Sequence, residues 1–459
     1  MRMTAADIAR VVGGDVEGNA AVAVLGAEVD SRRLEGGDLY VALPGARRDG
    51  HDFVGTALET AAAALVRHDA RLAAPPPERA LVRVDDPLAA YHELARRELQ
   101  EHPWRVAALT GSVGKTTSKN FLAALLAPHH RIGASSGNRN NTLGLPAEIL
   151  SQEPDIEVFV AEAGMSTPGE LAILGEILRP EMLLYTRIAP VHTEFFPDLA
   201  GVVRAKAELL PWLDGDGTLV VNADDPNQDS FPDETGARVL RYGTAASEAR
   251  IDDLEDRGLL GSRFRLVLPG SEAMVELAMP GRHQADNLLA AAAGASTFGV
   301  RADQVAETAP GLRVPEHRGR VFSIGDGISL VDDSYNASPV AMQRLLELLA
   351  RAPGRRVAVL GEMYELGDLA EEAHRLVGTE AAAACDLLVA VGGADAGLIA
   401  DGARKAGLRD DVVHLVEDAG RAAELLHRVL RSGDVVLVKG SRGVGLDRTV
   451  VALTGEGAA

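Results

Sequence analysis

The sequence is poor in cysteine and lacks long apolar runs. Cys385 is the single cysteine among 459 residues, which excludes an internal disulfide framework and a cysteine-rich zinc site. Because it stands in an alanine-rich stretch, we interpret it as a small core residue. No run of about 18 apolar residues and no basic-plus-apolar signal near residue 1 is present. We therefore expect a soluble cytoplasmic enzyme with no stable membrane insertion.

Positive charge is also scarce. The chain has 46 Lys and Arg residues against 67 Asp and Glu residues, a formal net charge of −21. A general nucleic-acid binder needs a basic face, so this balance argues against that class. An anionic substrate is still compatible with it, because local Arg and Lys residues can hold phosphates within an acidic protein. The length is sufficient for about two to four domains with large cores.

The strongest chemical signal is a glycine-rich loop between an apolar strand, 105–109, and a helical pattern. The loop reads Thr110-Gly-Ser-Val-Gly-Lys-Thr-Thr117. Backbone N–H groups and a helix N-terminus would point at a phosphate, Lys115 would reach the outer phosphates, and Thr116 would bind Mg²⁺. The usual motif has glycine six residues before the lysine, where this chain has Leu109. A chance glycine turn is the alternative, which the strand–loop–helix setting disfavours. The predicted triphosphate contacts are Gly111, Ser112, Val113, Gly114, Lys115, Thr116 and Thr117.

Three blocks follow one another along the chain. The first, to about residue 84, mixes a short helix with strand-like pieces, and a polar amphipathic stretch at 87–101 leads to the glycine loop. The middle block has the βα rhythm of a parallel sheet. The third, from about residue 314, reads as a second doubly wound unit without the dinucleotide-binding glycine pattern. The predicted strands are 22–29 and 38–42 in the first block, 106–109, 157–161, 182–186 and 219–222 in the middle block, and 329–332, 356–360, 387–391 and 435–438 in the third.

Polar residues follow the predicted strands of the middle block, where an open parallel sheet binds ligands. Glu162 could approach a Mg²⁺ ion on the glycine loop, or it could be a solvated acid. His192 could be a second metal ligand, although a lone loop histidine is more often structural. Lys206 by itself reads as a surface lysine. Asn287, near the start of an alanine-rich helix, could bond a base edge or cap its own helix.

The third block carries candidates of its own. Asp332 and Asp333 end a predicted strand and could hold a ribose hydroxyl pair, and Arg318 precedes them. Lys439 and Arg442 follow the last strand and could hold a carboxylate or a phosphate, which Arg can bind in a bidentate manner. Solvated loop charges are the alternative for each.

Further motifs accompany these residues along nearly the whole chain. They are Asp30-Ser-Arg-Arg33, Gly37-Asp-Leu-Tyr-Val-Ala-Leu43, Asp49-Gly-His-Asp-Phe53, Gly137-Asn-Arg-Asn-Asn-Thr-Leu-Gly144, Glu162-Ala-Gly164, Ala205-Lys206, Asn222-Ala-Asp-Asp225, Asp332-Asp-Ser-Tyr-Asn336, Leu360-Gly-Glu-Met363, Glu365-Leu-Gly367 and Lys439-Gly-Ser-Arg442. With the glycine loop, His192 and Asn287, they resemble, in order, the motifs of the Mur ligase family. No single short motif decides the match, but their number and order do.

The resemblance implies an α/β fold with three domains. A mixed α/β N-terminal domain (1–84) would bind the UDP end of the substrate. A central P-loop ATPase domain (85–312) would have a mainly parallel sheet, and a C-terminal Rossmann-like doubly wound domain (313–459) would bind the acceptor. The implied reaction is ATP-dependent amide formation in cytoplasmic peptidoglycan precursor synthesis, which joins D-alanyl-D-alanine to UDP-N-acetylmuramoyl-tripeptide through an acyl phosphate. We expect a monomer with no nucleic-acid partner.

The resemblance also implies a metal site. Thr116 and Glu162 would bind one Mg²⁺ ion, and His192 would bind a second. Lys206 matches a lysine that the family carries in N-carboxylated form, and a carbamate is an anionic oxygen donor that suits Mg²⁺. Lys115, His192 and Lys206 are thus the implied catalytic residues.

Contacts with ATP and with the substrates follow from the same resemblance. The implied ATP contacts beyond the glycine loop are Asn287, Arg318, Asp332 and Asp333. The implied substrate contacts are Ser31, Arg32, Asp49, Gly50, His51, Asn138, Asn140, Asn141, Lys439, Ser441 and Arg442.

A few positions depart from the family pattern, and other functions compete with this one. Ala163 stands where Met is usual, Arg187 where Asn is usual, and the stretch after Arg442 is less typical. A related Mur ligase that adds a single amino acid is the main alternative, but its typical Asp-Tyr-Ala-His-Asn-Pro and Asp-Asn-Pro-Arg motifs are replaced or absent here. A folylpolyglutamate synthetase leaves the UDP-type first block unexplained. A P-loop kinase or switch protein leaves the first and third blocks unexplained.

Overall fold

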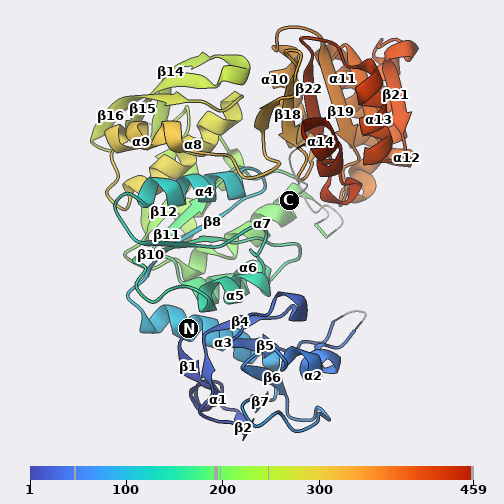
Figure 1. The fold of residues 1–459 in the computed structure, drawn as a ribbon. Coiled ribbons are helices and arrows are strands. Elements are labelled where there is room, and N and C mark those ends of the chain that lie inside the picture. The colour runs from blue at the N-terminus through green and yellow to red at the C-terminus, as the bar shows by residue number, and fades with distance from the viewer. Residues whose placement is uncertain (46–47, 191–194, 197, 247, 456–459) are drawn as a thin grey trace.

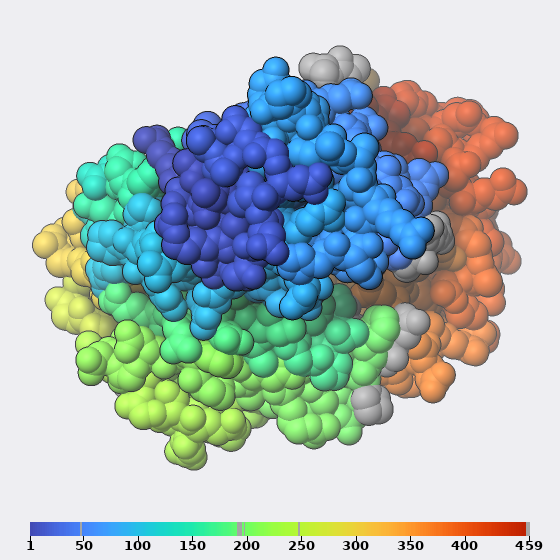
Figure 2. Space-filling model, turned by 90° about the horizontal axis from the view of Figure 1, so that it is seen from below, coloured from blue at the N-terminus to red at the C-terminus, as the bar shows by residue number. Residues whose placement is uncertain are grey.

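The chain folds into three α/β units that follow one another from the N-terminus to the C-terminus (Figure 1). The computed structural model describes residues 1–45, 48–190, 195–196, 198–246 and 248–455. Seen from the N-terminal side, the first unit covers part of the central unit, and the C-terminal unit lies beside them (Figure 2). The predicted α/β class, with parallel sheets in the central and C-terminal units, is confirmed.

The N-terminal unit is built on a mixed five-stranded sheet. Its strand order is β2-β7-β6-β5-β4, with β4 to β7 parallel and β2 antiparallel to β7. Helix α1 begins at a capping box, in which Thr4 and Asp7 bond each other's backbone N–H, and ends at Gly13 in the left-handed region. The elements are β1 (Met3–Thr4), α1 (Ala5–Val12), β2 (Asp15–Gly18), β3 (Ala23–Val24), β4 (Gly26–Glu28), β5 (Asp38–Val41), α2 (Val54–Ala57), β6 (Ala63–Arg67) and β7 (Ala80–Val84).

The central unit has a six-stranded parallel sheet in the order β13-β12-β11-β8-β10-β9. The first strand in the sequence, β8, lies between β11 and β10, so the strand order reverses beside the glycine loop, where ligands bind in open α/β sheets. The elements are α3 (Pro87–Glu101), β8 (Arg105–Thr110), α4 (Lys115–Leu126), β9 (Ile132–Ala134), α5 (Gly144–Leu150), β10 (Val158–Glu162), α6 (Glu170–Leu178), β11 (Met182–Tyr185), α7 (Leu199–Ala207), β12 (Thr218–Asn222), β13 (Arg238–Tyr242), α8 (Arg282–Ser296) and α9 (Ala302–Thr308).

A three-stranded antiparallel sheet, which lies outside the strands predicted from the sequence, covers α8 and α9. Its strands are β14 (Arg250–Asp256), β15 (Ser262–Leu268) and β16 (Ser271–Leu277). Apolar residues of β15 at alternate positions, Phe264, Leu266 and Leu268, are buried in the same core as α8. This period of two is the ordinary signature of a strand with one buried face.

The C-terminal unit is a doubly wound sheet in the order β17-β18-β22-β19-β20-β21, in which only β17 pairs in the antiparallel sense. Each predicted strand of this block is present, and each is almost entirely buried. The elements are β17 (Arg320–Ser323), β18 (Ser329–Asp333), α10 (Pro339–Ala350), β19 (Arg356–Gly361), α11 (Ala370–Ala384), β20 (Leu387–Val391), α12 (Ala394–Lys405), β21 (Val413–Val416), α13 (Ala419–Val429), β22 (Val435–Lys439) and α14 (Asp447–Thr454).

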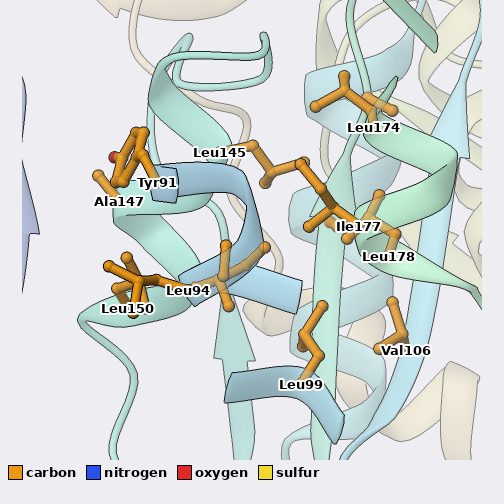
Figure 3. Packing of buried hydrophobic residues seen from close by; sticks show 14 of the residues in the cluster. Tyr91, Leu94, Leu99, Val106, Leu145, Ala147, Leu150, Leu174, Ile177 and Leu178 are labelled. Carbon is orange, nitrogen blue, oxygen red and sulfur yellow. The ribbon is translucent and has the colours of Figure 1, made fainter. Parts of the chain in front are cut away.

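Helix α3 joins the first two units into one hydrophobic core. Its residues Tyr91, Leu94 and Leu99 pack against α5, α6 and β8, as Figure 3 shows. The same core continues to α1 and to one face of the N-terminal sheet. The two units are therefore held together by apolar burial, which fixes the N-terminal unit relative to the glycine loop.

No helix in the described part of the chain combines the length and the apolar character needed to cross a lipid bilayer. Cys385 is buried at the end of α11, in agreement with its interpretation as a core residue.

Candidate active site

The glycine loop connects β8 to α4 and cannot carry side chains at two of its positions. Gly111 and Gly114 have φ angles of 145° and 90°, where L side chains are strained. A Cβ on Gly111 would lie 2.0 Å from Thr186 Oγ1, and one on Gly114 would lie 2.4 Å from Asn287 Oδ1. Leu109 is the buried penultimate residue of β8, so the position of the missing glycine is still inside the sheet.

The backbone that follows β11, the strand beside β8 in the sheet, supports this loop. The N–H groups of Ser112 and Val113 both donate to the carbonyl of Arg187, over 2.8 and 3.2 Å, and Ser112 Oγ donates to the carbonyl of Ala189. Arg187, the residue that departs from the family pattern, therefore holds the loop through its backbone, whatever its side chain does.

Lys115 begins α4 and points back over the loop. Its Nζ donates to the carbonyl of Ser112 over 3.3 Å. Partial burial lowers the pKa of Lys115, the carboxylate of Glu162 opposes this effect, and Arg318 adds to it. Within the described ranges no carboxylate forms an ion pair with this ammonium group, which suits it to bind a phosphate. Thr116 is buried in the first turn of the same helix.

Glu162 ends β10 and is 2% exposed, which excludes a solvated acid. Asn140 Nδ2 donates to Glu162 Oε1 over 2.8 Å. Glu162 Oε2 is buried and accepts no hydrogen bond from the described residues. An unsatisfied buried polar atom costs about 1–3 kcal/mol, and a charged one costs more, so this oxygen fits a site for a cation.

Lys206 on α7 is buried inside the molecule, so its reading as a surface lysine, made from the residue alone, is wrong, and the resemblance had already moved it to the metal site. It is 2% exposed, and its Nζ donates to Thr110 Oγ1 over 3.3 Å. Burial, with the nearby charge of Lys115, lowers the pKa of Lys206 well below its usual range. Burial thus favours the neutral amine over the ammonium form, because charge in a low-dielectric site is costly without a partner.

The proposed second metal ligand, His192, lies outside the described residues. Within the described ranges, no cluster of three or more His, Cys, Asp and Glu residues is arranged to hold a metal ion. Of the predicted ligands, the structure thus places Thr116, Glu162 and Lys206 on the elements that surround the glycine loop.

A large cavity separates the glycine loop from the C-terminal unit. It encloses about 1640 Å³, part of it open to solvent. Residues of the central unit on its wall include Lys115 and Asn287, and the C-terminal unit contributes charged, polar and apolar side chains. Predicted residues on the wall are Ser112, Val113, Gly114, Lys115, Thr117, Asn138, Asn287, Arg318, Asp333, Lys439, Ser441 and Arg442.

The two aspartates at the end of β18 have different environments. Asp332 is 1% exposed, and both of its carboxylate oxygens already have partners within the protein. Ser334 Oγ donates to one over 2.6 Å, and His317 Nδ1 lies 2.7 Å from the other. Asp333 faces the cavity and forms an ion pair with Lys439. Of the two, Asp333 is the one that a ligand can reach.

Two guanidinium groups flank one aromatic ring on the C-terminal wall of the cavity. Arg318 and Arg442 lie 4.2 and 5.1 Å from the ring centre of Tyr335. Cation–π contact of this kind orients the guanidinium groups while leaving their N–H edges free for an anion. Tyr335 was not predicted as a site residue, although its ring contacts two predicted ones, Arg318 and Arg442.

Asn287 faces the glycine loop and does not cap its helix. Helix α8 begins at Arg282, so Asn287 lies in its second turn, and its Nδ2 donates to Gln284 Oε1 over 3.3 Å. A second cavity of about 760 Å³, part of it open to solvent, adjoins Asn287. Its wall includes the rings and apolar groups of Tyr242, Ile251 and Leu289, which suits a flat base.

Some of the predicted substrate contacts in the N-terminal unit already have hydrogen-bond or ion-pair partners within the protein. Arg32 is strongly exposed and forms a two-point pair with Asp30, over 2.9 and 2.7 Å. Both ring nitrogens of His51 are engaged, by Asp49 Oδ1 at 2.6 Å and by the backbone N–H of Arg67. His51 therefore holds the shape of the 49–53 turn. Ser31 is the first residue of the helical turn that carries Arg32, and Gly50 N donates to Leu43 O over 2.8 Å.

Asn141 has a structural contact as well. Its Oδ1 accepts from the backbone of Leu143 and Gly144, at the start of α5, over 3.2 and 2.8 Å. Asn138 and Asn140, by contrast, face the cavity and Glu162.

One buried cation next to the site was missed. Lys119 follows Lys115 by one helical turn, is 4% exposed, and donates from Nζ to the carbonyl of Ser135. Burial lowers the pKa of Lys119, and the charges of Glu162 and Glu148 oppose this effect. The spacing of four residues from Lys115 was the available signal, because such residues share a helix face.

Comparison with known proteins assigns all three units to one family. Residues 24–99 match the "Mur ligase family, catalytic domain", residues 109–295 the "Mur ligase middle domain", and residues 317–442 the "Mur ligase, glutamate ligase domain". The chain belongs to the Mur ligase family. A UDP-N-acetylmuramoyl-tripeptide–D-alanyl-D-alanine ligase of Escherichia coli (strain K12) is 33% identical to this Mur ligase over 464 residues, which cover 99% of each protein.

Solved structures agree with this Mur ligase over almost its full length. A crystal structure of MurF from Acinetobacter baumannii matches with a TM-score of 0.89 at 25% identity and covers 99% of both chains. MurF from Thermotoga maritima in complex with ADP matches with a TM-score of 0.81 at 28% identity, over 94% of this chain and 97% of that one.

Proposed function

We propose that this Mur ligase joins D-alanyl-D-alanine to UDP-N-acetylmuramoyl-tripeptide at the expense of ATP. The observation that carries the proposal is the full-length match, at 33% identity, to a relative that bears this activity in its name. The use of ATP is supported by the glycine loop and by the relative that binds ADP.

The proposed chemistry is activation of a carboxylate followed by amide formation. The terminal carboxylate of the tripeptide attacks the γ-phosphorus of ATP, the bond to ADP breaks, and an acyl phosphate forms. The amino group of the dipeptide attacks the acyl carbon and gives a tetrahedral intermediate, which loses phosphate and a proton. Lys115 and the backbone N–H groups of the glycine loop stabilise the charge that develops on the transferred phosphoryl group.

Mg²⁺ ions at this site would neutralise the two anions that must meet. We propose two such ions, with Thr116 and Glu162 as ligands for one. The unsatisfied Oε2 of Glu162 supports this choice. His192 is proposed for the second ion from the family resemblance alone.

Lys206 is proposed to act as a carbamate. Its neutral Nζ can attack CO₂, which forms an N–C bond, releases a proton and turns the side chain into an oxygen donor. The lowered pKa of Lys206 supports this, because only the neutral amine is nucleophilic.

The three units are proposed to share the ligands. Residues 1–84 would hold the UDP end through Ser31, Arg32 and the wall at 49–51. Residues 85–312 would hold ATP, with Asn287 beside the base, and residues 313–459 would hold the acceptor near Lys439, Ser441 and Arg442. Arg318 and Asp333 would contact the nucleotide. Every proposed group comes from one chain, which is consistent with an active monomer, and we place the reaction in the cytoplasm.

Phosphate release and product mass test the proposal. The purified protein is incubated with ATP, Mg²⁺, UDP-N-acetylmuramoyl-tripeptide and D-alanyl-D-alanine, and each component is omitted in turn. Phosphate and the pentapeptide product are expected only when both substrates are present. Phosphate release with neither substrate would overturn the ligase proposal.

Lys115→Ala supplies the site-specific control. Loss of the loop cation should lower turnover by at least about 100-fold, the effect of removing one transition-state donor, with an unchanged circular dichroism spectrum. Lys405→Ala, on the exposed face of α12, is the matched lysine variant and should leave turnover unchanged. Near-normal turnover of Lys115→Ala would contradict the phosphate role.

A further inference from the structure

Arg139 lies between two carboxylates that belong to different units of the molecule. Its Nη1 lies 2.9 Å from Glu28 Oε2 of the N-terminal unit, and its Nε lies 3.0 Å from Glu148 Oε1 of the central unit. The side chains are 15%, 8% and 9% exposed, in the order Arg139, Glu28 and Glu148. A buried Arg with two buried acids is held in one geometry, because its planar fork must match both.

Each of the two carboxylates also holds backbone. Glu28 Oε1 accepts from the N–H groups of Val29 and Asp30, over 2.8 and 3.1 Å, where the proposed UDP-binding stretch begins. Glu148 accepts from the N–H group and the hydroxyl of Ser136, over 2.7 and 3.1 Å. Arg139 therefore links the 30–33 stretch to the loop at residues 135–140.

The same loop is attached to the end of β10, where Glu162 stands. Ser135 Oγ accepts from the N–H of Glu162 over 3.0 Å, and the carbonyl of Asn140 accepts from the N–H of Gly164 over 2.7 Å. Asn140 Nδ2 donates to Glu162 Oε1, and Lys119 donates to the carbonyl of Ser135. A chain of direct contacts thus runs from the 30–33 stretch to Glu162.

We propose that Arg139 is a positioning residue that couples occupancy of the UDP-binding stretch to the geometry of Glu162. The inference rests on the proposed function, since it takes the 30–33 stretch as the nucleotide end and Glu162 as a cation ligand. A nucleotide bound at 30–33 acts on Glu28 through the backbone of Val29 and Asp30, and the Glu28–Arg139–Glu148 triad transmits the resulting displacement to the loop that holds Glu162. Binding energy from a remote part of the substrate then serves the reacting centre.

Arg139→Met removes the triad while it keeps the apolar stem, and Arg139→Lys keeps the charge but not the fork. Glu28→Gln is a smaller, isosteric change on the other side of the link. The matched control is Arg2→Met, because Arg2 pairs with Glu153 across the same two units at 3.5 Å, but with both side chains more than 70% exposed.

The primary measurement is the affinity of the protein–ADP complex for Mn²⁺, followed by electron paramagnetic resonance with and without UDP-N-acetylmuramoyl-tripeptide. We expect UDP-N-acetylmuramoyl-tripeptide to tighten Mn²⁺ binding in the natural protein and in Arg2→Met. We expect no such effect in Arg139→Met, Arg139→Lys or Glu28→Gln. Loss of a residue that orients a metal ligand should weaken Mn²⁺ about 10-fold. In turnover assays, kcat of the Arg139 and Glu28 variants should fall, whereas their KM for D-alanyl-D-alanine should stay unchanged.

The outcomes separate this inference from the proposed function. Absence of product with the natural protein would refute the function, whatever the Mn²⁺ data show. Product formation without an effect of UDP-N-acetylmuramoyl-tripeptide on the Mn²⁺ affinity of the natural protein would refute the coupling. An effect as large in Glu28→Gln and Arg139→Met as in the natural protein would refute it as well. If Arg139→Met lowers the melting temperature strongly, Glu28→Gln, which leaves the Arg139–Glu148 pair in place, decides the question.

Discussion

At the scale of single residues, the site gathers three lysines around one carboxylate. Lys119 and Lys206 are buried, Lys115 is partly buried, and all three have a lowered pKa near Glu162. Taking ammonium groups out of water is costly unless anions compensate them. The site is therefore destabilised without its ligands, and phosphate, carboxylate or carbamate groups relieve that cost when they bind.

Lys206→Ala tests the carbamate role. The variant should be inactive, because an oxygen donor is missing, and short carboxylic acids such as acetate should restore part of the activity by occupying the vacated space. Turnover is measured against acetate concentration. Lys115→Ala, which loses a cation, should gain nothing from acetate, and a Lys206→Ala enzyme with natural activity would disprove the idea.

His283 makes stability depend on pH. Burial, together with Arg344 and Lys439, lowers the pKa of this histidine to about 4, although Asp333 opposes the shift. The folded state therefore stays unprotonated while the unfolded state takes up a proton below about pH 6.5, so folding free energy is lost as the pH falls from about 6.5 to 4. His283→Gln should lose less stability than the natural protein between pH 7 and pH 5, by at most about 2 kcal/mol. Denaturant unfolding at the two pH values measures this, and equal losses would contradict the assignment.

Adjacent residues show the limit of sequence reasoning at this scale. Asp332 and Asp333 were equivalent candidates, but neighbouring residues of a strand point to opposite faces. The fold turns Asp332 toward His317 and Ser334 and turns Asp333 toward the cavity. Residue type alone does not distinguish them.

At the scale of elements, α3 connects two units that have separate sheets. Its bounds, Pro87–Glu101, coincide with the amphipathic stretch read from the sequence, because Asp86 caps the helix and Pro87 occupies its first turn. Its apolar face packs on both units. Local signals were enough to predict the helix. They did not predict that its apolar face packs against two different units.

Leu94→Ala tests the shared core. Leu94 is fully buried between the two units, so the substitution should cost about 2–5 kcal/mol of unfolding free energy. Arg97→Ala on the exposed side of the same helix removes one exposed ion pair with Glu101 and should cost less than about 1 kcal/mol. Urea unfolding followed by circular dichroism measures both. A cost below 1 kcal/mol for Leu94→Ala would show that α3 is not part of a common core.

At the scale of the whole molecule, the C-terminal unit faces the glycine loop across a cavity lined with cations. One direct link is the ion pair of Arg351 and Asp256 at 3.1 Å, in which Arg351 is 68% exposed. Leu259 also packs against the C-terminal core. Exposed ion pairs contribute about 0–1 kcal/mol, so this ion pair is a weak link, and we expect the two units to move relative to each other.

Ligand binding should draw the C-terminal unit toward the central one. Lys115 and Arg318 are like charges on the wall of one cavity, and Arg318 lowers the pKa of Lys115, so a polyphosphate between them would replace repulsion with attraction. A non-hydrolysable ATP analogue with UDP-N-acetylmuramoyl-tripeptide should reduce the radius of gyration in small-angle X-ray scattering. Adenosine in place of the analogue lacks the phosphates and should not. An unchanged radius with the analogue would contradict closure.

The sequence by itself determined the glycine loop, the strands that flank it and the order of motifs that marks the Mur ligase family. These features depend on residues close together in the chain, through backbone conformation, helix capping and alternating burial. The tertiary structure decided which polar residues are free to act. It buried Lys206 beside Thr110, left one oxygen of Glu162 with no hydrogen bond from any described residue, and set Arg139 between Glu28 and Glu148. Burial and pairing are properties of segments far apart in the chain, so no local pattern could reveal them.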